Sequence, residues 1–322
     1  MDQVADIAWL LAKPVSMLFD PASPWNLVLL TLCFVFTLLF VVVARTRRSG
    51  AQLKFAAFAR FIFDRRVWLH RSSLVDYKLF ALNTVLMASV FGIFVLGSEF
   101  WQVHAAHGLA ALFGPPPASA SPGWGVFALT MALQILALDF GYWLAHLTFH
   151  RVGFLWEFHK VHHSAQVMTP ATEMRQHPVE LLFFPPFYGL TSGLTYAVMV
   201  QIFGAEAQQL GIQGQTLLLA LHLATFHHLR HSHVNMPFTG VWGRLFHSPA
   251  HHRIHHSADP RHFDRNLGYL FSIWDWMAGT LIMPRKGERI TIGLGQEGAT
   301  HDSLRAVMWL PVRRTWERVA GR

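Results

Sequence analysis

Long apolar runs are the feature that most limits the folds open to this sequence. Residues 26–44 contain no charged side chain, and four further apolar runs occupy residues 78–97, 123–146, 179–203 and 211–226. A helix needs roughly 20 residues to cross about 30 Å of hydrocarbon. Because 52% of the residues are hydrophobic and only 14% are charged, we expect an all-α, multi-pass integral membrane protein.

The first apolar run is expected to remain in the mature protein. It begins only at residue 26 and is followed by the basic segment ARTRRSG, which is typical of a stop-transfer signal and not of a cleaved signal peptide. The single cysteine, Cys33, lies inside this run. Neither a disulfide framework nor a thiolate metal site is therefore expected.

The distribution of basic residues predicts the orientation of the chain in the membrane. Nine Lys and Arg residues lie between residues 45 and 78, whereas residues 98–123 contain none, and the stretch GPPPASASPG at 114–123 is expected to form a loop on the opposite side. Basic loops stay on the cytoplasmic side. This bias accounts for the formal net charge of +8, so nucleic-acid binding is not expected. Amphipathic helices along the membrane surface are expected near residues 7–19 and 55–70.

We expect one integral-membrane domain over residues 1–322. Within it, residues 1–122 would form N-terminal membrane helices and a basic loop, residues 123–283 a catalytic region, and residues 284–322 a cytoplasmic tail. The helix beginning at residue 123 would carry its C-terminal end beyond the hydrocarbon, towards the cytoplasm. The pair Pro185-Pro186 predicts a kink or an interruption in the run at 179–203.

Histidines gather at the predicted cytoplasmic ends of these helices. Seventeen of the 21 histidines lie between residues 146 and 262. Two pairs have i, i+4 spacing, which places both rings on one helical face, and the pattern H-x-x-H-H occurs twice. Together these motifs supply ten imidazoles: His146, His150, His159, His162, His163, His227, His231, His252, His255 and His256.

Ten clustered imidazoles favour a site for two metal ions. Neutral imidazole has a pKa near 6.5, and crowding several rings disfavours their charged forms, so a bound cation is the natural stabiliser. Adjacent histidines in each H-x-x-H-H span an arc wide enough to reach two ions. Imidazole suits Zn, Cu, Fe and Ni, so the ligands leave the metal open. The H-E-x-x-H motif of zinc proteases is absent from the sequence.

The histidine motifs and their flanking residues resemble a known family. The segments DFGYWLAHLTFHRVGFLWEFHKVHHSA, MRQHP and SPAHHRIHHSADPRHFDRNLGYLFSIWDWMAGTL, between residues 139 and 281, are similar to the fatty acid hydroxylase/sterol desaturase superfamily of integral-membrane di-iron enzymes. The resemblance implies a helical membrane fold with a cytoplasmic helical cap that holds a histidine-rich di-metal site. It also implies two iron ions, O2 as co-substrate and oxidation of an unactivated lipid C–H bond. Zinc could occupy the purified protein.

Carried onto this sequence, the family pattern assigns the ten histidines as metal ligands, with His227 bound directly or through a water molecule. Ligand histidines usually donate their other N–H to a carboxylate, a carbonyl or water. Candidates for this supporting role are Asp139, His177, Asp264, Asn266 and Asp275. His177 could alternatively be a ligand, and Asp275 a helix cap.

The expected function is O2-dependent hydroxylation of a lipid, with desaturation as the less favoured outcome. No flavin or nicotinamide motif is expected, because GLGQEG at 293–298 lacks the strand-turn-helix context that a dinucleotide-binding motif requires. Electrons would come from a ferredoxin, or a cytochrome of the b type, with its reductase. The histidine motifs would lie at the cytoplasmic side of the membrane, which is the inner membrane in a bacterium. A histidine-rich metal transporter and a haem-binding electron-transfer protein are the alternatives.

Overall fold

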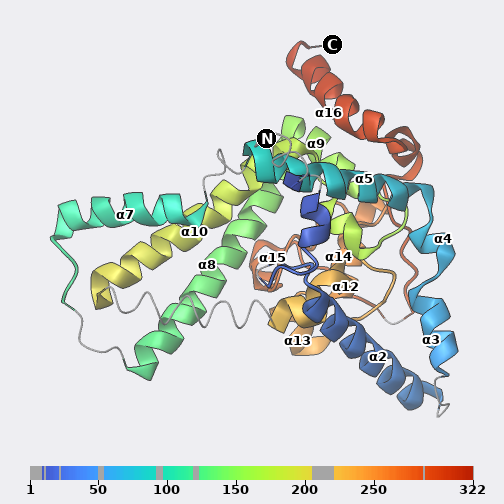
Figure 1. The fold of residues 1–322 in the computed structure, drawn as a ribbon, viewed down its shortest axis with the longest axis horizontal. Coiled ribbons are helices and arrows are strands. Elements are labelled where there is room, and N and C mark those ends of the chain that lie inside the picture. Colours follow the sequence, from blue (N-terminus) through green and yellow to red (C-terminus); the bar gives the residue numbers. More distant parts are fainter. Residues whose placement is uncertain are drawn as a thin grey trace.

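The structure, a computed structural model, describes residues 9–10, 12–21, 23–49, 54–91, 97–118, 123–204, 221–285 and 287–321. These residues form helices and two isolated β-bridges, with no β-strand among them. The expected all-α class is therefore confirmed. The chain consists of a body of short helices, a projecting arm of three long helices and a separate N-terminal helix (Figure 1).

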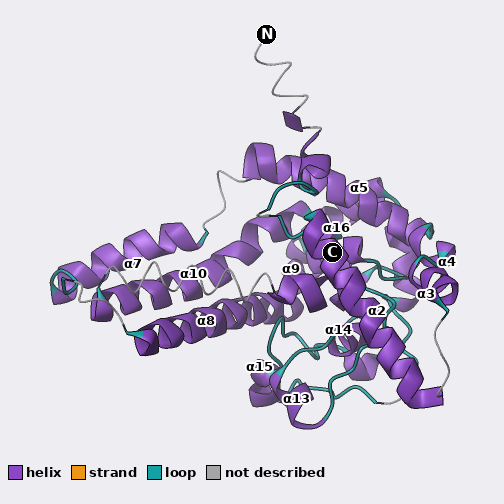
Figure 2. Ribbon diagram, turned by 60° about the horizontal axis from the view of Figure 1, so that its bottom comes forward, coloured by secondary structure: helices purple, strands orange, loops and turns teal. Residues whose placement is uncertain are grey.

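The arm consists of α7 (Ser98–Phe113), α8 (Trp124–Arg151) and α10 (Pro178–Phe203), which lie along one another in both ribbon views (Figures 1 and 2). Glycines permit this close packing. A Cβ atom on Gly193 would lie 2.7 Å from Cβ of Trp101 in α7, and one on Gly141 of α8 would lie 2.4 Å from Cα of Tyr188 in α10. Side chains at these positions would force the helices apart.

Helix α2 (Leu27–Ser49) leaves the body in a different direction from the arm (Figure 1). It packs on α3 (Phe55–Ile62) and on the chain that follows η3 (Leu223–His227). Their shared hydrophobic cluster contains Cys33, Phe58, Ile62, Leu229, Val234 and Met236. Helices α2 and α3 are thus packed against the segment that carries His231.

The body is assembled from short helices that surround the ends of α8 and α10. They are α4 (Arg65–Trp68), α5 (Arg71–Leu86), η1 (Met87–Phe91), α9 (Gly153–His163), η2 (Pro170–Met174), α12 (His228–Arg230), α13 (Gly240–Leu245), α14 (Pro249–His255), η4 (Pro260–His262), α15 (Ile273–Ala278), η5 (Gly295–His301) and α16 (Leu304–Val319). A buried ion pair between Arg175 and Asp76, with N···O 2.7 Å, ties η2 to α5.

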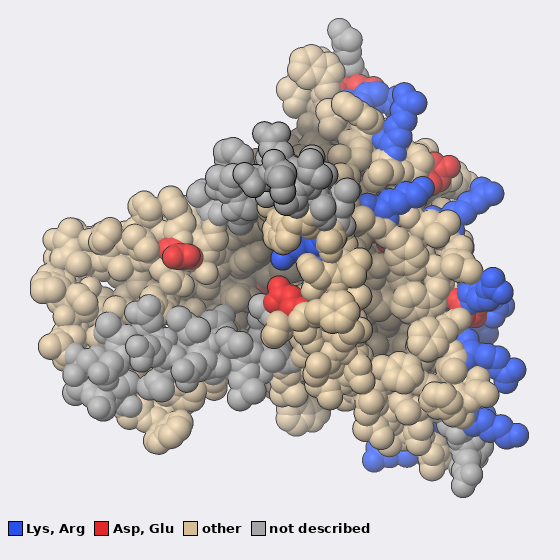
Figure 3. All heavy atoms as spheres, viewed as in Figure 1, with Lys and Arg blue, Asp and Glu red and all other residues tan. Residues whose placement is uncertain are grey.

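Two of the described helices, Leu27–Arg47 and Trp124–Arg151, are long and apolar enough to cross a membrane by length and composition. They correspond to the runs expected at residues 26–44 and 123–146. The Lys and Arg side chains visible in Figure 3 gather at the end of the molecule away from the arm. The run expected at 211–226 lies outside the described residues as far as residue 220.

Local details add to the expectations. Residues 98–113 form helix α7, which packs along α10. Helix α10 runs through Pro185 and Pro186, so the interruption that was one of the two outcomes expected there is not observed. The helix that contains the start of the apolar run at 78–97 begins earlier, at Arg71, and its buried polar side chains bond to the body: Asn83 Nδ2 donates to the carbonyl of Gln176 at 2.9 Å.

Candidate metal centre

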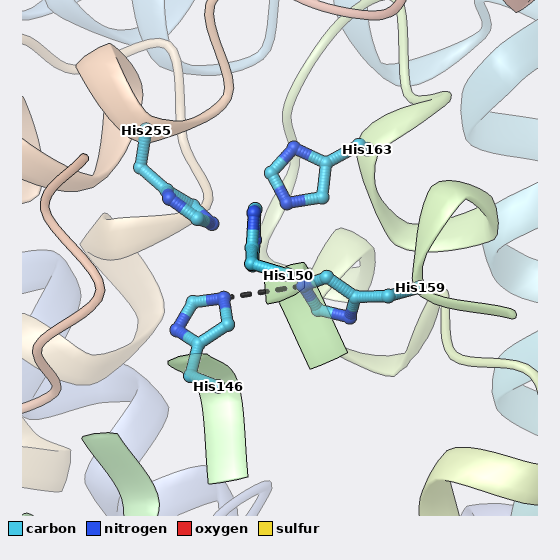
Figure 4. A group of neighbouring side chains, drawn as sticks. All are labelled: His146, His150, His159, His163 and His255. Carbon is cyan, nitrogen blue, oxygen red and sulfur yellow. Dashed lines mark hydrogen bonds between the residues drawn. The ribbon is translucent and has the colours of Figure 1, made fainter. Parts of the chain in front are cut away.

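Nine of the ten histidines come together in two neighbouring buried groups. Within each group the candidate ligand atoms lie within 4.8 Å of one another. Group A, drawn in Figure 4, contains His146, His150, His159, His163 and His255. Group B contains His162, His231, His252 and His256.

Helical geometry distributes the ligands between the two groups. His146 and His150 are one turn apart at the end of α8 and both face group A. In each H-x-x-H-H the adjacent histidines separate: His163 joins group A and His162 joins group B. An angle of roughly 100° between successive helical residues is what lets one short helix serve both groups. The same H-x-x-H-H pattern recurs at α14, where His255 joins group A and His256 joins group B.

In group A, backbone carbonyls fix the tautomers of two rings. Nδ1 of His146 donates to the carbonyl of Leu267 at 2.8 Å, and Nδ1 of His255 donates to the carbonyl of Arg265 at 2.9 Å. A carbonyl only accepts, so each neutral ring keeps a lone pair on Nε2. The Nε2 atoms of His150, His163 and His255 are buried without a hydrogen-bond partner among the described residues.

A cation fits this arrangement. Nε2 of His146 lies 3.1 Å from Nε2 of His159, whose Nδ1 is 2.6 Å from Glu180 Oε2. With a proton on each Nδ1, the two Nε2 lone pairs face each other, and that contact is repulsive unless a positive ion lies between them. Buried lone pairs that converge without donors are the donor set a metal ion requires.

Group B is held by a different set of neighbours. Nε2 of His231 lies 3.1 Å from Nε2 of His162 and 2.7 Å from Nε2 of His252. Nδ1 of His231 is 2.6 Å from Glu173 Oε2. Nη2 of Arg230 lies 3.3 Å from Nδ1 of His252. A carboxylate and a guanidinium thus flank group B, whereas group A has carbonyls and carboxylates.

Burial keeps the imidazoles uncharged. Burial lowers the pKa well below the usual value for six grouped histidines on α9, on α14 and directly after α14, and neighbouring imidazoles lower it further; these are His159, His162, His163, His252, His255 and His256. Neutral rings present free lone pairs at physiological pH. Metal binding at these positions therefore requires no ring to lose a proton.

A family comparison assigns this region. The fatty acid hydroxylase family matches residues 131–280, which include both histidine groups. These residues, a little under half of the chain, are similar to the fatty acid hydroxylase family. The resemblance inferred from the sequence is therefore confirmed.

Curated relatives are also similar to part of the chain. Alkylglycerol monooxygenase of Caenorhabditis elegans is 27% identical over 180 residues, covering 56% of this chain and 31% of that protein. The Xenopus tropicalis alkylglycerol monooxygenase is 29% identical over 165 residues, 51% of this chain and 33% of that protein. An ornithine lipid hydroxylase of Rhizobium tropici is 28% identical over 172 residues, 52% and 46% respectively.

The alignments thus span about a third of the length of the alkylglycerol monooxygenases. No solved structure matches the chain.

In the hydroxylase domain, His227 lies outside both groups. Its Nδ1 pairs with the hydroxyl of Tyr269 at 3.0 Å. The i, i+4 argument fails here because η3 is a π-helical turn and α12 ends at Arg230, so His231 has non-helical backbone angles (φ −99°, ψ 66°). The two rings therefore do not share a helical face.

Of the proposed supporting residues, Asp264 contacts a grouped histidine: its Oδ1 lies 3.1 Å from Nδ1 of His150. Asp139 and Asp275 instead accept backbone N–H groups of the turn at 267–271, including Leu270 at 2.6 Å and Leu267 at 3.0 Å. They support His146 indirectly, since the Leu267 carbonyl accepts from that ring.

Two other proposed supports also act on the backbone. Asn266 bonds to the backbone of His251 and Ile282, and its positive φ of 55° fits an asparagine in a tight turn. His177 caps the start of α10 by accepting from the N–H of Val179. The structure places neither side chain on a grouped histidine.

The sequence reasoning missed Glu173, Glu180 and Arg230. Glu180 follows His177 by three residues, which is the spacing of a capping box, and the structure contains that box. The capping box accounts for Oε1 of Glu180, which accepts from the N–H of His177. Oε2 of Glu180 instead contacts Nδ1 of His159, which is distant in sequence and carries no local signal. Glu173 and Arg230 have no local signal, because their partners lie far away in sequence.

Proposed function

We propose that this chain is a membrane-bound di-iron oxygenase that hydroxylates an unactivated C–H position of a lipid. The observation that carries the proposal is the pair of adjacent, buried, neutral histidine groups within a fatty acid hydroxylase domain. When bound there, two iron ions would supply O2 activation, which side chains alone do not provide. Desaturation is the second outcome open to such a centre.

An apolar cavity beside group B suits a lipid chain. Its volume is about 650 Å³. Its described lining contains no Asp, Glu, Lys or Arg and consists of Ile135, Leu138, Leu221, His222, Thr225, Phe226, Pro237, Phe238, Thr239, Trp242, Phe246, His247, Leu270 and Phe271. The ring of His247 lies 5.9 Å from the ring of His252. Hydrocarbon in this cavity would end close to the histidine groups, away from water.

The protein's own contribution is ligation and orientation. The nine grouped histidines would hold the metals, and the carbonyls of Leu267 and Arg265 would fix ring orientation together with Asp264, Glu173 and Glu180. Such outer contacts raise ligand basicity and restrict ring rotation. We propose that Asp139 and Asp275 act one step further out, by fixing the turn that carries the Leu267 carbonyl.

The reaction as proposed needs two electrons from outside the chain. A ferredoxin, or a cytochrome of the b type with its reductase, would deliver them at the cytoplasmic side. We place α2 and α8 across the membrane on the basis of their length and composition. The charge asymmetry of the sequence supports a cytoplasmic position for the histidine groups.

The test is a comparison of host lipids with and without the gene by mass spectrometry. A product that gains one oxygen, with matching O2 consumption by the iron-loaded protein, supports the proposal. A product that loses two hydrogens would make the enzyme a desaturase. Metal movement across vesicles without O2 consumption would contradict the proposal and favour a transporter, and a haem spectrum would favour the electron-transfer alternative.

A further inference from the structure

Helix α16 carries an exposed apolar face. Trp309, Val312, Trp316 and Val319 follow one another at intervals of three or four residues, so they lie along one side of the helix. They are between 43% and 73% exposed. The other side of α16 packs on the body through the fully buried Val307. Tryptophan is enriched at the centres of protein interfaces, so this face has the composition of a binding surface.

The same helix is basic. Residues 304–319 contain four arginines and one glutamate. Arg305 lies one turn before Trp309, Arg313 lies between the two tryptophans, and both arginines are exposed. Glu317 approaches Arg313 at 3.4 Å, but both side chains are exposed, and such pairs contribute little. Apolar side chains among positive charges are complementary to an acidic protein surface.

Hydrogen bonds connect α16 to group A. The carbonyl of Met308 accepts from Nε2 of His177 at 3.1 Å. The backbone N–H of His177 donates to Oε1 of Glu180 at 3.0 Å, and Oε2 of Glu180 lies 2.6 Å from Nδ1 of His159. Met308 directly precedes the exposed Trp309. The exposed face is therefore joined to a grouped histidine by a continuous chain of contacts.

Helix α16 lies beyond the C-terminal end of α8. Oγ1 of Thr315 donates to the carbonyl of Phe154 at 3.3 Å, and Nη2 of Arg318 donates to Oε1 of Glu157 at 2.8 Å; both partners follow α8 in the chain. The 28 residues of α8 extend over about 42 Å, more than the roughly 30 Å of hydrocarbon. If α8 crosses the membrane, α16 stands outside the hydrocarbon, where a water-soluble protein can reach it.

The lipid cavity lies elsewhere on the body. Trp242 of α13 lines the cavity, and α13 and α16 lie apart in both ribbon views (Figures 1 and 2). The cavity approaches group B through His247, whereas α16 is connected to group A. The exposed face of α16 is thus not needed to admit the lipid.

We propose that the exposed face of α16 docks an acidic electron-carrier protein. The inference rests on the proposed function, which needs two electrons from outside the chain. Each reduced carrier gives up one electron and leaves oxidised, so two successive dockings supply one reaction. Arg305 and Arg313 pair with carboxylates of the carrier, and the two tryptophans form the apolar centre of the contact. Electrons and lipid then approach the histidine groups from different sides.

Titration with defined carriers measures the docking. The metal-loaded protein in phosphatidylcholine nanodiscs is titrated with two acidic carriers, a plant-type [2Fe–2S] ferredoxin and the soluble domain of an acidic cytochrome of the b type, and with the basic cytochrome c. We expect an acidic carrier to bind at least about tenfold more tightly than cytochrome c, which corresponds to about 1.4 kcal/mol. Its affinity should fall as salt is added.

Variants of α16 locate the contact. Arg313→Glu and Trp309→Ala should each weaken binding of the acidic carrier about tenfold or more, while melting temperature and metal content stay at the wild-type values because both side chains are exposed. The matched control is Arg261→Glu, which reverses the charge of another exposed arginine paired with a carboxylate, Asp259 at 2.5 Å. This control should bind the carrier as the wild type does.

Tight binding of neither acidic carrier would overturn the inference, as would equal affinity for cytochrome c or an Arg313→Glu variant that binds like the wild type. Flotation with anionic vesicles that Trp309→Ala abolishes, without carrier binding, would assign the face to a lipid surface and also overturn it. Carrier binding without oxygenated product in the turnover assay would count against the proposed function and leave the docking face standing. Oxygenated product formed with a chemical reductant, without carrier binding, would do the reverse.

Discussion

At the residue scale, the grouped histidines differ in the hydrogen-bond partner of Nδ1, the ring nitrogen that would not bind the metal. Those of group A have acceptors at Nδ1 for four of five rings, through Leu267, Arg265, Asp264 and Glu180. In group B, Nδ1 of His162 and His256 is without a partner in the described structure. Because an acceptor at Nδ1 raises ligand basicity, we expect group A to retain its metal longer during chelation.

The first prediction separates ligands from nearby histidines. His255→Ala removes a ring whose Nε2 has no partner but the proposed metal, so metal content should fall below two per chain and turnover should fall about 100-fold or more, on the order of 3 kcal/mol. The control is His233→Ala, whose ring bonds to the Phe61 carbonyl at 2.8 Å. Anaerobic metal analysis and product formation measure both. Two metals retained in His255→Ala would refute its role as a ligand.

His227 provides a sharper test of the ligand count. The side chain pairs with Tyr269 outside both groups, so His227→Asn should keep two metals and a rate within about tenfold of wild type, since an amide can still pair with the tyrosine hydroxyl. Metal titration and single-turnover kinetics give the answer. If this variant loses a metal as His255→Ala is expected to, the nine grouped histidines do not suffice to hold two metal ions.

At the element scale, the centre depends on helices that approach more closely than ordinary side chains permit. Gly141→Ala in α8 would place its Cβ atom 2.4 Å from Cα of Tyr188. Overpacking of this kind typically costs about 1–3 kcal/mol, and backbone contacts relax less than side-chain ends. We expect a lower melting temperature and weaker metal retention.

The matched control for that helix contact is Gly108→Ala in α7, where an added Cβ meets nothing within 4 Å. This change should leave melting and metal content unaffected, or raise stability slightly through helix propensity. Equal melting temperatures for the two variants would show that α8 and α10 separate easily.

The turn at 267–271 is the second element on which the centre relies. Asp275 accepts the N–H groups of Leu267 and Gly268 and the hydroxyl of Thr280. Asp275→Asn loses one acceptor oxygen, so the Leu267 carbonyl should orient His146 less well. We expect metal affinity to fall about 10- to 100-fold, measured by competition with a chelator. Affinity equal to wild type would limit Asp275 to holding the turn at 267–271 without effect on the metal.

At the scale of the whole molecule, the arm places the C-terminal end of α7 and the start of α8 far from the histidine groups. Helix α7 leads away from the body, and α8 returns over 28 residues to deliver His146 and His150. Gly114 ends α7 at the far end, whereas α16 and the C-terminal end lie beside the body (Figure 1). If the arm crosses the membrane, these two points lie on opposite sides.

The topology prediction follows directly. A reporter fused after Gly114 should be exposed outside the cytoplasm, and one fused at Arg322 should be cytoplasmic, when assayed in intact cells and lysates. Both reporters on one side would exclude a membrane-crossing arm and the charge-based orientation with it.

The sequence by itself determined the helical class, the two apolar helices 27–47 and 124–151, and nine of the histidines that the structure gathers into two groups. These features follow from composition and from helical periodicity, which act over a few residues. Periodicity also separates His162 from His163, because successive helical side chains point in different directions.

Only the tertiary structure decided which partners complete the centre. His227 lies outside both groups because a π-helical turn and a helix end intervene before His231, and its role as a ligand stays a prediction. Glu180, Glu173 and the Leu267 carbonyl reach the rings through contacts between distant segments. Arg230 lies beside His252 for the same reason. Local pattern specifies which side chains a helix presents, whereas the packing of separate elements specifies what those side chains meet.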